Sequence, residues 1–204
     1  MTGTDWIAEL HRLERGHRRG PSIPQAWPRL GDTTPPPLHE EEVEEAEAQL
    51  GIVFPADYRH HLLRVGAGGR GLHALTRGAQ GWGWYGNTET NHDLLTHPFP
   101  HPDSYAAYDD ELGDREPPRE DQAAWDMWDA ECGVLQERKT AGAVFLREGG
   151  CGFRSLLVVT GPHRGEMWFD ARATCDLLLP MRLGGSPATF ADWAGRGFAD
   201  LVQW

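Results

Sequence analysis

The sequence predicts an α+β domain with N-terminal helices, a mainly antiparallel central sheet and a C-terminal helix. Apolar residues at helical spacing occupy two neighbouring segments between residues 40 and 65, which predicts two short helices. Short apolar runs near 143–147, 155–160 and 166–170 predict strands, and a capped apolar segment from Thr189 predicts the last helix. Helices followed by strands and a further helix favour an α+β arrangement over alternating βαβ units.

The first helix of this domain is predicted to end at residue 50. Val43, Ala46 and Leu50 recur at i, i+3 and i+7 and so form one apolar stripe. Gly51 can adopt the left-handed conformation that closes such a helix. The other faces are acidic and are expected to be solvated; they carry Glu41, Glu42, Glu44, Glu45 and Glu47.

A second helix is predicted to start at Pro55, because a first helical turn tolerates proline, whose missing N–H has no intrahelical acceptor to lose. Tyr58, Leu62 and Val65 follow at helical spacing and are expected to form its buried stripe. The glycine-rich run 66–71 ends it. The two helices are therefore expected to meet at a tight corner.

The first 37 residues are predicted to be an appendage to a domain that spans residues 38–204. Residues 4–16 predict an isolated amphipathic helix, and the Pro- and Gly-rich stretch 18–37 predicts a linker or an extended strap. The apolar side of this helix needs a partner. We expect it to pack on the core or, as the alternative, on another protein.

The middle of the chain is predicted to hold an aromatic segment and then a loop-rich acidic insertion. Trp82, Trp84 and Tyr85 lie among glycines. They either cover the edge of the core or, if exposed, act as anchors for a partner, because Trp and Tyr are enriched at binding hot spots. Residues 87–120 show little apolar periodicity and are rich in Pro, His, Asp and Glu, which predicts loops.

A helix is predicted at 120–132, ahead of the three strands. The five-residue connection 161–165 between the last two strands is compatible with an antiparallel hairpin. Thr189 and Asp192 have the spacing of a capping box. Phe190, Trp193 and Leu201 are expected on the inner side of the helix that this box opens.

Three segments of the chain resemble the SMI1/KNR4 superfamily, also called SUKH. The first joins the acidic helix to the Leu-Gly-x-x-x-Pro-x-x-Tyr corner at 50–58 and the glycine loop after it. The second is the Gly-rich start and apolar strand at 150–161 with the Gly-Glu-x-Trp strand at 165–168, and the third is Thr-Phe-x-x-Trp at 189–193. The resemblance implies that family's α+β fold and a binding module, in a bacterial immunity-type member.

The composition disfavours several classes of function. A net charge of −12 argues against direct nucleic-acid binding, because acidic side chains repel a phosphate backbone. The sequence has neither an apolar run long enough to span a membrane nor the basic-then-apolar start of a signal peptide. Three cysteines without paired spacing argue against a disulfide framework. We therefore expect a cytoplasmic protein without membrane contact.

The sequence assembles no catalytic set, and we expect no enzyme activity, no metal and no cofactor. The prolines between His97 and His101 prevent the helix that would place both rings on one face. Cys151 has only His163 as a nearby base, which favours a cysteine that fills a small apolar space over a nucleophile. A small metal- or cysteine-dependent hydrolase is the least favoured alternative.

The resemblance and the charge together predict an immunity protein that binds and neutralises a cognate toxin, with a basic domain such as a nuclease as its partner. An acidic surface can mimic a nucleic-acid backbone toward such a domain, although a solvated loop is the simpler interpretation. A regulatory scaffold or adaptor without a toxin partner is the alternative function. The candidate contact residues are Trp82, Trp84, Tyr85, Asp109, Asp110, Glu111, Asp114 and Glu116.

Overall fold

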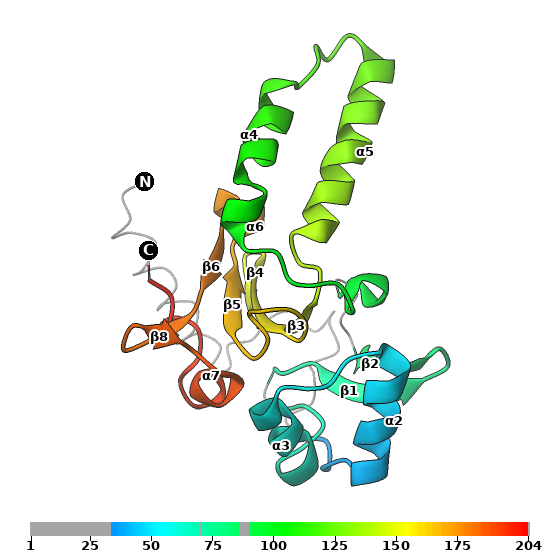
Figure 1. Cartoon of the computed structure of the whole chain (residues 1–204), viewed down its shortest axis with the longest axis vertical. Coiled ribbons are helices and arrows are strands. Elements are labelled where there is room, and N and C mark those ends of the chain that lie inside the picture. Colours follow the sequence, from blue (N-terminus) through cyan, green and yellow to red (C-terminus); the bar gives the residue numbers. More distant parts are fainter. Residues whose placement is uncertain (1–33, 70, 86–89, 204) are drawn as a thin grey trace, which may run out of the picture.

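A computed structural model of the chain describes residues 34–69, 71–85 and 90–203. A four-stranded sheet lies at its centre (Figure 1). Two short helices lie at one end of the sheet, and a longer helix pair extends away at the other end. These helices are α2 (Glu40–Leu50), α3 (Ala56–Arg64), α4 (Ala106–Asp114) and α5 (Gln122–Arg138). The expected helix at 4–16 and nearly all of the linker lie outside the described residues.

Helix α2 has the apolar stripe that its sequence predicts. Val43, Ala46 and Leu50 are buried, while most of the glutamates face solvent. Gly51 closes the helix in the left-handed conformation with a φ of 67°, as expected. The local pattern of this segment is therefore enough to fix the helix and its end.

Helix α3 begins immediately after Pro55, which occupies the position before its first turn. Tyr58 and Leu62 are buried as expected. The prediction for Val65 is wrong, because its side chain is 54 % exposed. The helix ends at Arg64, so the direction of the next side chain no longer continues the helical stripe.

The aromatic segment forms an antiparallel hairpin of β1 (Ala74–Gly78) and β2 (Gly81–Tyr85). The side chains of Trp82 and Trp84 are only 5 % and 4 % exposed, so they belong to the core. The indole N–H of Trp84 donates to the hydroxyl of Tyr58 at 2.8 Å and thereby links the hairpin to α3. Burial of this hydroxyl raises the pKa of Tyr58 above its ordinary value.

The central sheet has the order β3-β4-β5-β6, and every neighbouring pair is antiparallel. The three expected strands are confirmed, and the fourth was not indicated by the sequence. The hairpin predicted across residues 161–165 is confirmed as the pairing of the second and third strands. The strands are β3 (Ala143–Gly150), β4 (Phe153–Val158), β5 (Met167–Asp170) and β6 (Leu178–Pro180). The α+β class is therefore confirmed.

Both faces of the sheet are covered. Leu157 and Phe169 join the main core, which also contains the buried stripes of α2 and α3. Leu156 and Trp168 belong to a second cluster together with Phe99, which precedes α4. Neighbouring residues thus point to opposite cores, which is the period-two pattern of a strand that is buried on both sides.

The C-terminal helix α7 (Phe190–Arg196) closes the main core. Thr189 and Asp192 form the predicted capping box, and Phe190 and Trp193 are buried. Leu201 is also buried, but it follows the helix instead of lying on its inner side. Short elements lead into this helix: α6 (Arg172–Cys175), β7 (Arg182–Leu183) and β8 (Ser186–Pro187).

The prediction of loops in the acidic insertion is wrong for residues 106–114, which form α4. Two short 3-10 helices precede it, η1 (His92–Leu94) and η2 (Pro102–Ser104). Leu112 is the only buried residue of α4, so the segment has no apolar period that a sequence could reveal. The helix predicted at 120–132 is confirmed and extends to Arg138. No helix in the described part of the chain is long and apolar enough to cross a membrane.

The contact between α3 and α7 is expected to make stability depend on pH. The ring of His61 packs against Phe190 with 5.1 Å between centroids, and burial lowers the pKa of His61 from its ordinary value of 6.5. The unfolded chain then binds a proton at His61 more readily than the folded chain does. The contribution of neutral His61 to the free energy of unfolding is therefore complete above pH 6.5 and is lost as the pH falls below that value. The free energy of unfolding is measured by urea denaturation at about pH 7.5 and about pH 5.5. Between these two values it should decrease less in His61→Phe than in the wild-type chain.

His60→Gln is the matched control, because His60 is the exposed neighbour on the same helix. This variant is expected to keep most of the pH dependence of the wild-type chain. The same loss of stability on acidification in His61→Phe and in wild type would contradict the role given to the buried imidazole.

Candidate functional site

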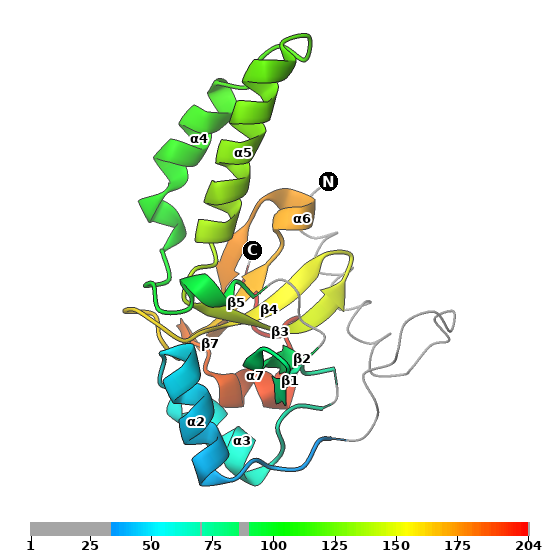
Figure 2. The ribbon, with the colours of Figure 1, turned by 90° about the vertical axis from the view of Figure 1, so that its right-hand side faces the viewer.

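Helices α4 and α5 form a helical hairpin that extends away from the sheet (Figure 1 and Figure 2). Residues 106–138 are called the acidic arm below. The acidic arm contains eleven Asp and Glu residues against three arginines, a net charge of −8 out of −12 for the whole chain. Two thirds of the net charge therefore lies on one projecting element.

The acidic candidates from the sequence all lie on this arm. Asp110, Glu111 and Asp114 are exposed on α4, and Glu116 is exposed just beyond its end. Asp109 differs, because it is half-buried and pairs with Lys139 at the base of the arm. Four of the five are thus presented to solvent, and most of the set lies on a helix where a loop was expected.

The two helices of the arm are held together across their acidic surfaces. Arg115 pairs with Glu131 of α5 at 2.9 Å, and the hydroxyl of Tyr108 also donates to Glu131. The indole N–H of Trp128 donates to the carbonyl oxygen of Leu112 at 2.8 Å. Hydrogen bonds from Arg115 and Tyr108 hold the pKa of Glu131 below its usual value, so this carboxylate stays charged at neutral pH.

Two contacts at the base of the arm involve buried charges: one joins α4 to the end of α5, and the other ties α5 to the segment beside the sheet. The ammonium of Lys139 lies 2.7 Å from the carboxylate of Asp109, and the lysine side chain is only 4 % exposed. Arg172 donates to the main-chain carbonyl of Gln136 at 2.7 Å and pairs with Asp170 at 2.9 Å. Asp170 is fully buried in β5. Since a buried charge is costly without its partner, the Lys139 pair holds the two helices together at the base, and Arg172 holds the end of α5 beside β5.

Exposed apolar side chains lie among the acidic residues of α5. Met127 is 70 % exposed and Val134 is 52 % exposed, and a spacing of seven residues places both on one side of the helix. The rings of Trp125 and Trp128, both half-buried, lie 5.0 Å apart between centroids. Met127 and Val134 were not among the candidates predicted from the sequence, where their heptad spacing was the available signal. The arm thus combines negative charge with apolar contact area.

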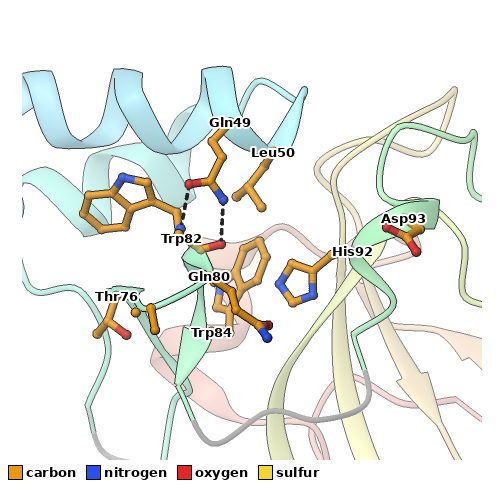
Figure 3. A pocket seen from close by; sticks show the side chains of 12 residues that line it. Gln49, Leu50, Thr76, Gln80, Trp82, Trp84, His92 and Asp93 are labelled. Carbon is orange, nitrogen blue, oxygen red and sulfur yellow. Dashed lines mark hydrogen bonds between the residues drawn. The ribbon is translucent and has the colours of Figure 1, made fainter.

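A second feature is a hollow of about 670 Å³ between the end of α2, the β1–β2 hairpin and η1 (Figure 3). Trp82 and Trp84 line this hollow, but their side chains are packed in the core. In the free protein they are therefore not exposed anchors. The side chain of Tyr85 lies outside the described part of the structure. Trp82 and Trp84 consequently contribute the wall of a hollow and no projecting surface.

Among the residues weighed for catalysis, the rings of His101 and His163 lie 5.4 Å apart between centroids, but Cys151 does not join them. Cys151 is exposed at the turn between β3 and β4, so the expectation that it fills an apolar space is wrong. His163 lies beyond the other end of β4, a strand length away from Cys151. Across residues 34–69, 71–85 and 90–203, no group of three or more His, Cys, Asp and Glu side chains is placed to hold a metal ion.

Residues 37–135 match the model of the SMI1 / KNR4 family (SUKH-1). This region of the chain belongs to the family. The matched region contains α2, α3, the β1–β2 hairpin and most of the acidic arm, so both surfaces described above lie within the SMI1/KNR4 region. The strands of the central sheet and α7 follow it in the chain. Neither the curated proteins nor the solved structures provide a match.

Removal of one charge at the base of the arm should destabilise the protein. Asp109→Asn leaves the ammonium of Lys139 buried beside a neutral amide, and we expect the free energy of unfolding to fall by about 1–3 kcal/mol. Asp110→Asn changes the exposed neighbour and should stay within about 0.5 kcal/mol of wild type. Urea denaturation measures both values. Equal losses in the two variants would mean that the Lys139 contact does not hold the arm.

Proposed function

We propose that this SMI1/KNR4 family member is a non-catalytic binding module that neutralises a toxin with a basic domain, and that the acidic arm is its contact surface. The observation that carries the proposal is a net charge of −8 on a helical hairpin whose base is fixed by Lys139 and Arg172. A charged surface that is already in place needs no ordering when a partner arrives, which lowers the cost of association.

Charge and apolar area on the arm have separate roles in this proposal. Complementary fields between the arm and a basic domain raise the association rate by roughly 10- to 1000-fold at low salt. Burial of the exposed Met127 and Val134 then stabilises the complex against dissociation. A nuclease domain fits this surface well, because its substrate groove is built to attract a line of negative charges.

Family membership supports a binding role, since the resemblance connects bacterial members with immunity to toxins. The proposed location is the cytoplasm, where the free cysteines Cys132, Cys151 and Cys175 would stay reduced. Nucleic acid is not the proposed ligand, because the same charges that attract a basic domain repel a phosphate backbone.

Capture from a lysate of the native host, followed by an activity assay, tests the proposal. The immobilised full-length chain is washed across a salt series, and each retained protein is identified by mass spectrometry and assayed with and without the free chain. We expect a basic protein to be retained at low salt, released as salt increases, and inhibited by the chain. An arm variant should lose about tenfold in affinity for it; this variant combines Asp110→Asn, Asp114→Asn and Glu116→Gln.

The control variant makes the same change in net charge away from the arm, at exposed positions. It combines Glu41→Gln, Glu44→Gln and Asp200→Asn, and is expected to bind as wild type does. Equal losses in the two variants would assign binding to overall charge and contradict the role of the arm. Specific retention of a regulator that has no toxic activity would contradict the immunity function and favour the adaptor.

A further inference from the structure

Strand β2 has an outer edge, because the β1–β2 sheet contains two strands within the described part of the chain. The hairpin closes at the pair Gly78 and Gly81, and the closing pair of such a two-residue hairpin exchanges both main-chain hydrogen bonds. Bonded and non-bonded pairs then alternate along the ladder. The main-chain N–H and C=O groups of Trp82 and Trp84 therefore point away from β1, at the outer edge.

Gln49 of α2 already binds this edge as a short piece of strand would. Its carboxamide accepts from the main-chain N–H of Trp82 at 2.8 Å and donates to the Trp82 carbonyl at 3.2 Å (Figure 3). The main-chain groups of Trp84 have no hydrogen-bond partner among residues 34–69, 71–85 and 90–203. An edge with unpaired donors and acceptors is a template for another strand.

The hollow beside this edge has room for an extended chain. Its volume is about 670 Å³, and the exposed Gln49, Gln80 and His92 are among the residues that line it. A Cβ at Gly83 would lie 3.1 Å from Nε2 of His92, so the glycine lets the imidazole lie close over the strand. The end of α2 stands on one side of the hollow and η1 on the other, so the hollow is bordered on two sides (Figure 3).

The charge and the walls of the hollow determine which kind of segment can bind there. Asp93 lines the hollow and is exposed, and its carboxylate forms no ion pair within the part of the chain that the structure describes. The walls formed by α2 and η1 favour a single extended segment over the edge strand of a folded sheet. An extended segment with Lys or Arg next to its pairing residue satisfies both conditions.

We propose that the outer edge of β2 binds an extended basic peptide segment of the protein partner by strand addition. The segment pairs its N–H and C=O groups with Trp84, displaces the carboxamide of Gln49 from Trp82, and places its basic side chain against Asp93. Gln49 acts as an internal competitor that covers the edge until a partner strand arrives. This inference rests on the proposed function only in that the chain binds a protein.

Amide NMR of the isotope-labelled full-length chain tests the inference with a designed peptide, acetyl-Thr-Val-Lys-Val-Thr-amide. One control peptide has its three central main-chain nitrogens methylated, and the other has Glu in place of Lys. We expect the Lys peptide to shift the main-chain amide resonances of Trp82, Gly83 and Trp84 in a saturable way. The control peptides are expected to cause no such shifts at the same concentrations.

Two variants separate strand addition from a merely structural role of the same residues. Gln49→Ala removes the internal competitor and should tighten binding of the Lys peptide by about 3- to 10-fold. Asp93→Asn should weaken it by a similar factor. If Gln49 only supports the hairpin, its removal leaves peptide affinity unchanged or lowers it, and that result would overturn the proposal. Equal binding of the methylated peptide, or the absence of shifts along β2, would overturn it as well.

The NMR measurement also distinguishes peptide binding from self-association of the chain, and a failure of the β2 edge from a failure of the acidic arm. Shifts along β2 that depend on the concentration of the chain without peptide would assign the edge to self-association and overturn the inference. The arm variant should keep the peptide-induced shifts at Trp84, whereas Gln49→Ala should keep the salt dependence of partner capture. Failure of the arm as a contact surface and failure of the β2 edge would therefore be seen in different experiments.

Discussion

Two buried charges at the base of the acidic arm hold its two helices together and attach the arm beside the sheet. The ammonium of Lys139 and the carboxylate of Asp170 are each held by an oppositely charged partner. Lys139 pairs with Asp109 of α4, while Asp170 pairs with Arg172, which also binds the carbonyl of Gln136 in α5. Each helix of the arm is thus tied to a buried charge. Removal of one partner from a buried pair is strongly destabilising, so the two helices stay joined at the base and α5 stays attached to Arg172 beside the sheet.

Because its base is attached, the arm can stay folded despite the repulsion among its own negative charges. Eleven acidic residues on one helical hairpin repel one another, and Arg115 opposes the repulsion by joining the helices through Glu131. If the base were loose, the same repulsion would favour frayed helices, and their ordering would weaken binding. The β2 edge lies at the other end of the molecule, where the hydrogen bond between Tyr58 and Trp84 holds the hairpin (Figure 1). The two surfaces therefore depend on different contacts.

Local sequence signals predicted the elements that bury an apolar stripe, such as α2 and the strands β3, β4 and β5. They failed for α4, whose only buried residue is Leu112. The acidic residues could be singled out because charge is a local property of the sequence. Their placement could not, because it depends on Asp109 meeting Lys139 across 30 positions, just as the covered edge of β2 depends on Gln49 meeting Trp82 across 33. Such contacts form only when the chain folds, and they leave no local pattern.

Amide hydrogen–deuterium exchange of the chain bound to its captured partner is the most direct test of whether the acidic arm is the contact surface. The comparison is between the free chain and a saturated complex. We expect slower exchange along α4 and α5, because a basic partner that covers their acidic faces suppresses opening of the helices. Unchanged exchange throughout residues 106–138 in a saturated, inhibited complex would contradict the claim that the acidic arm is the contact surface.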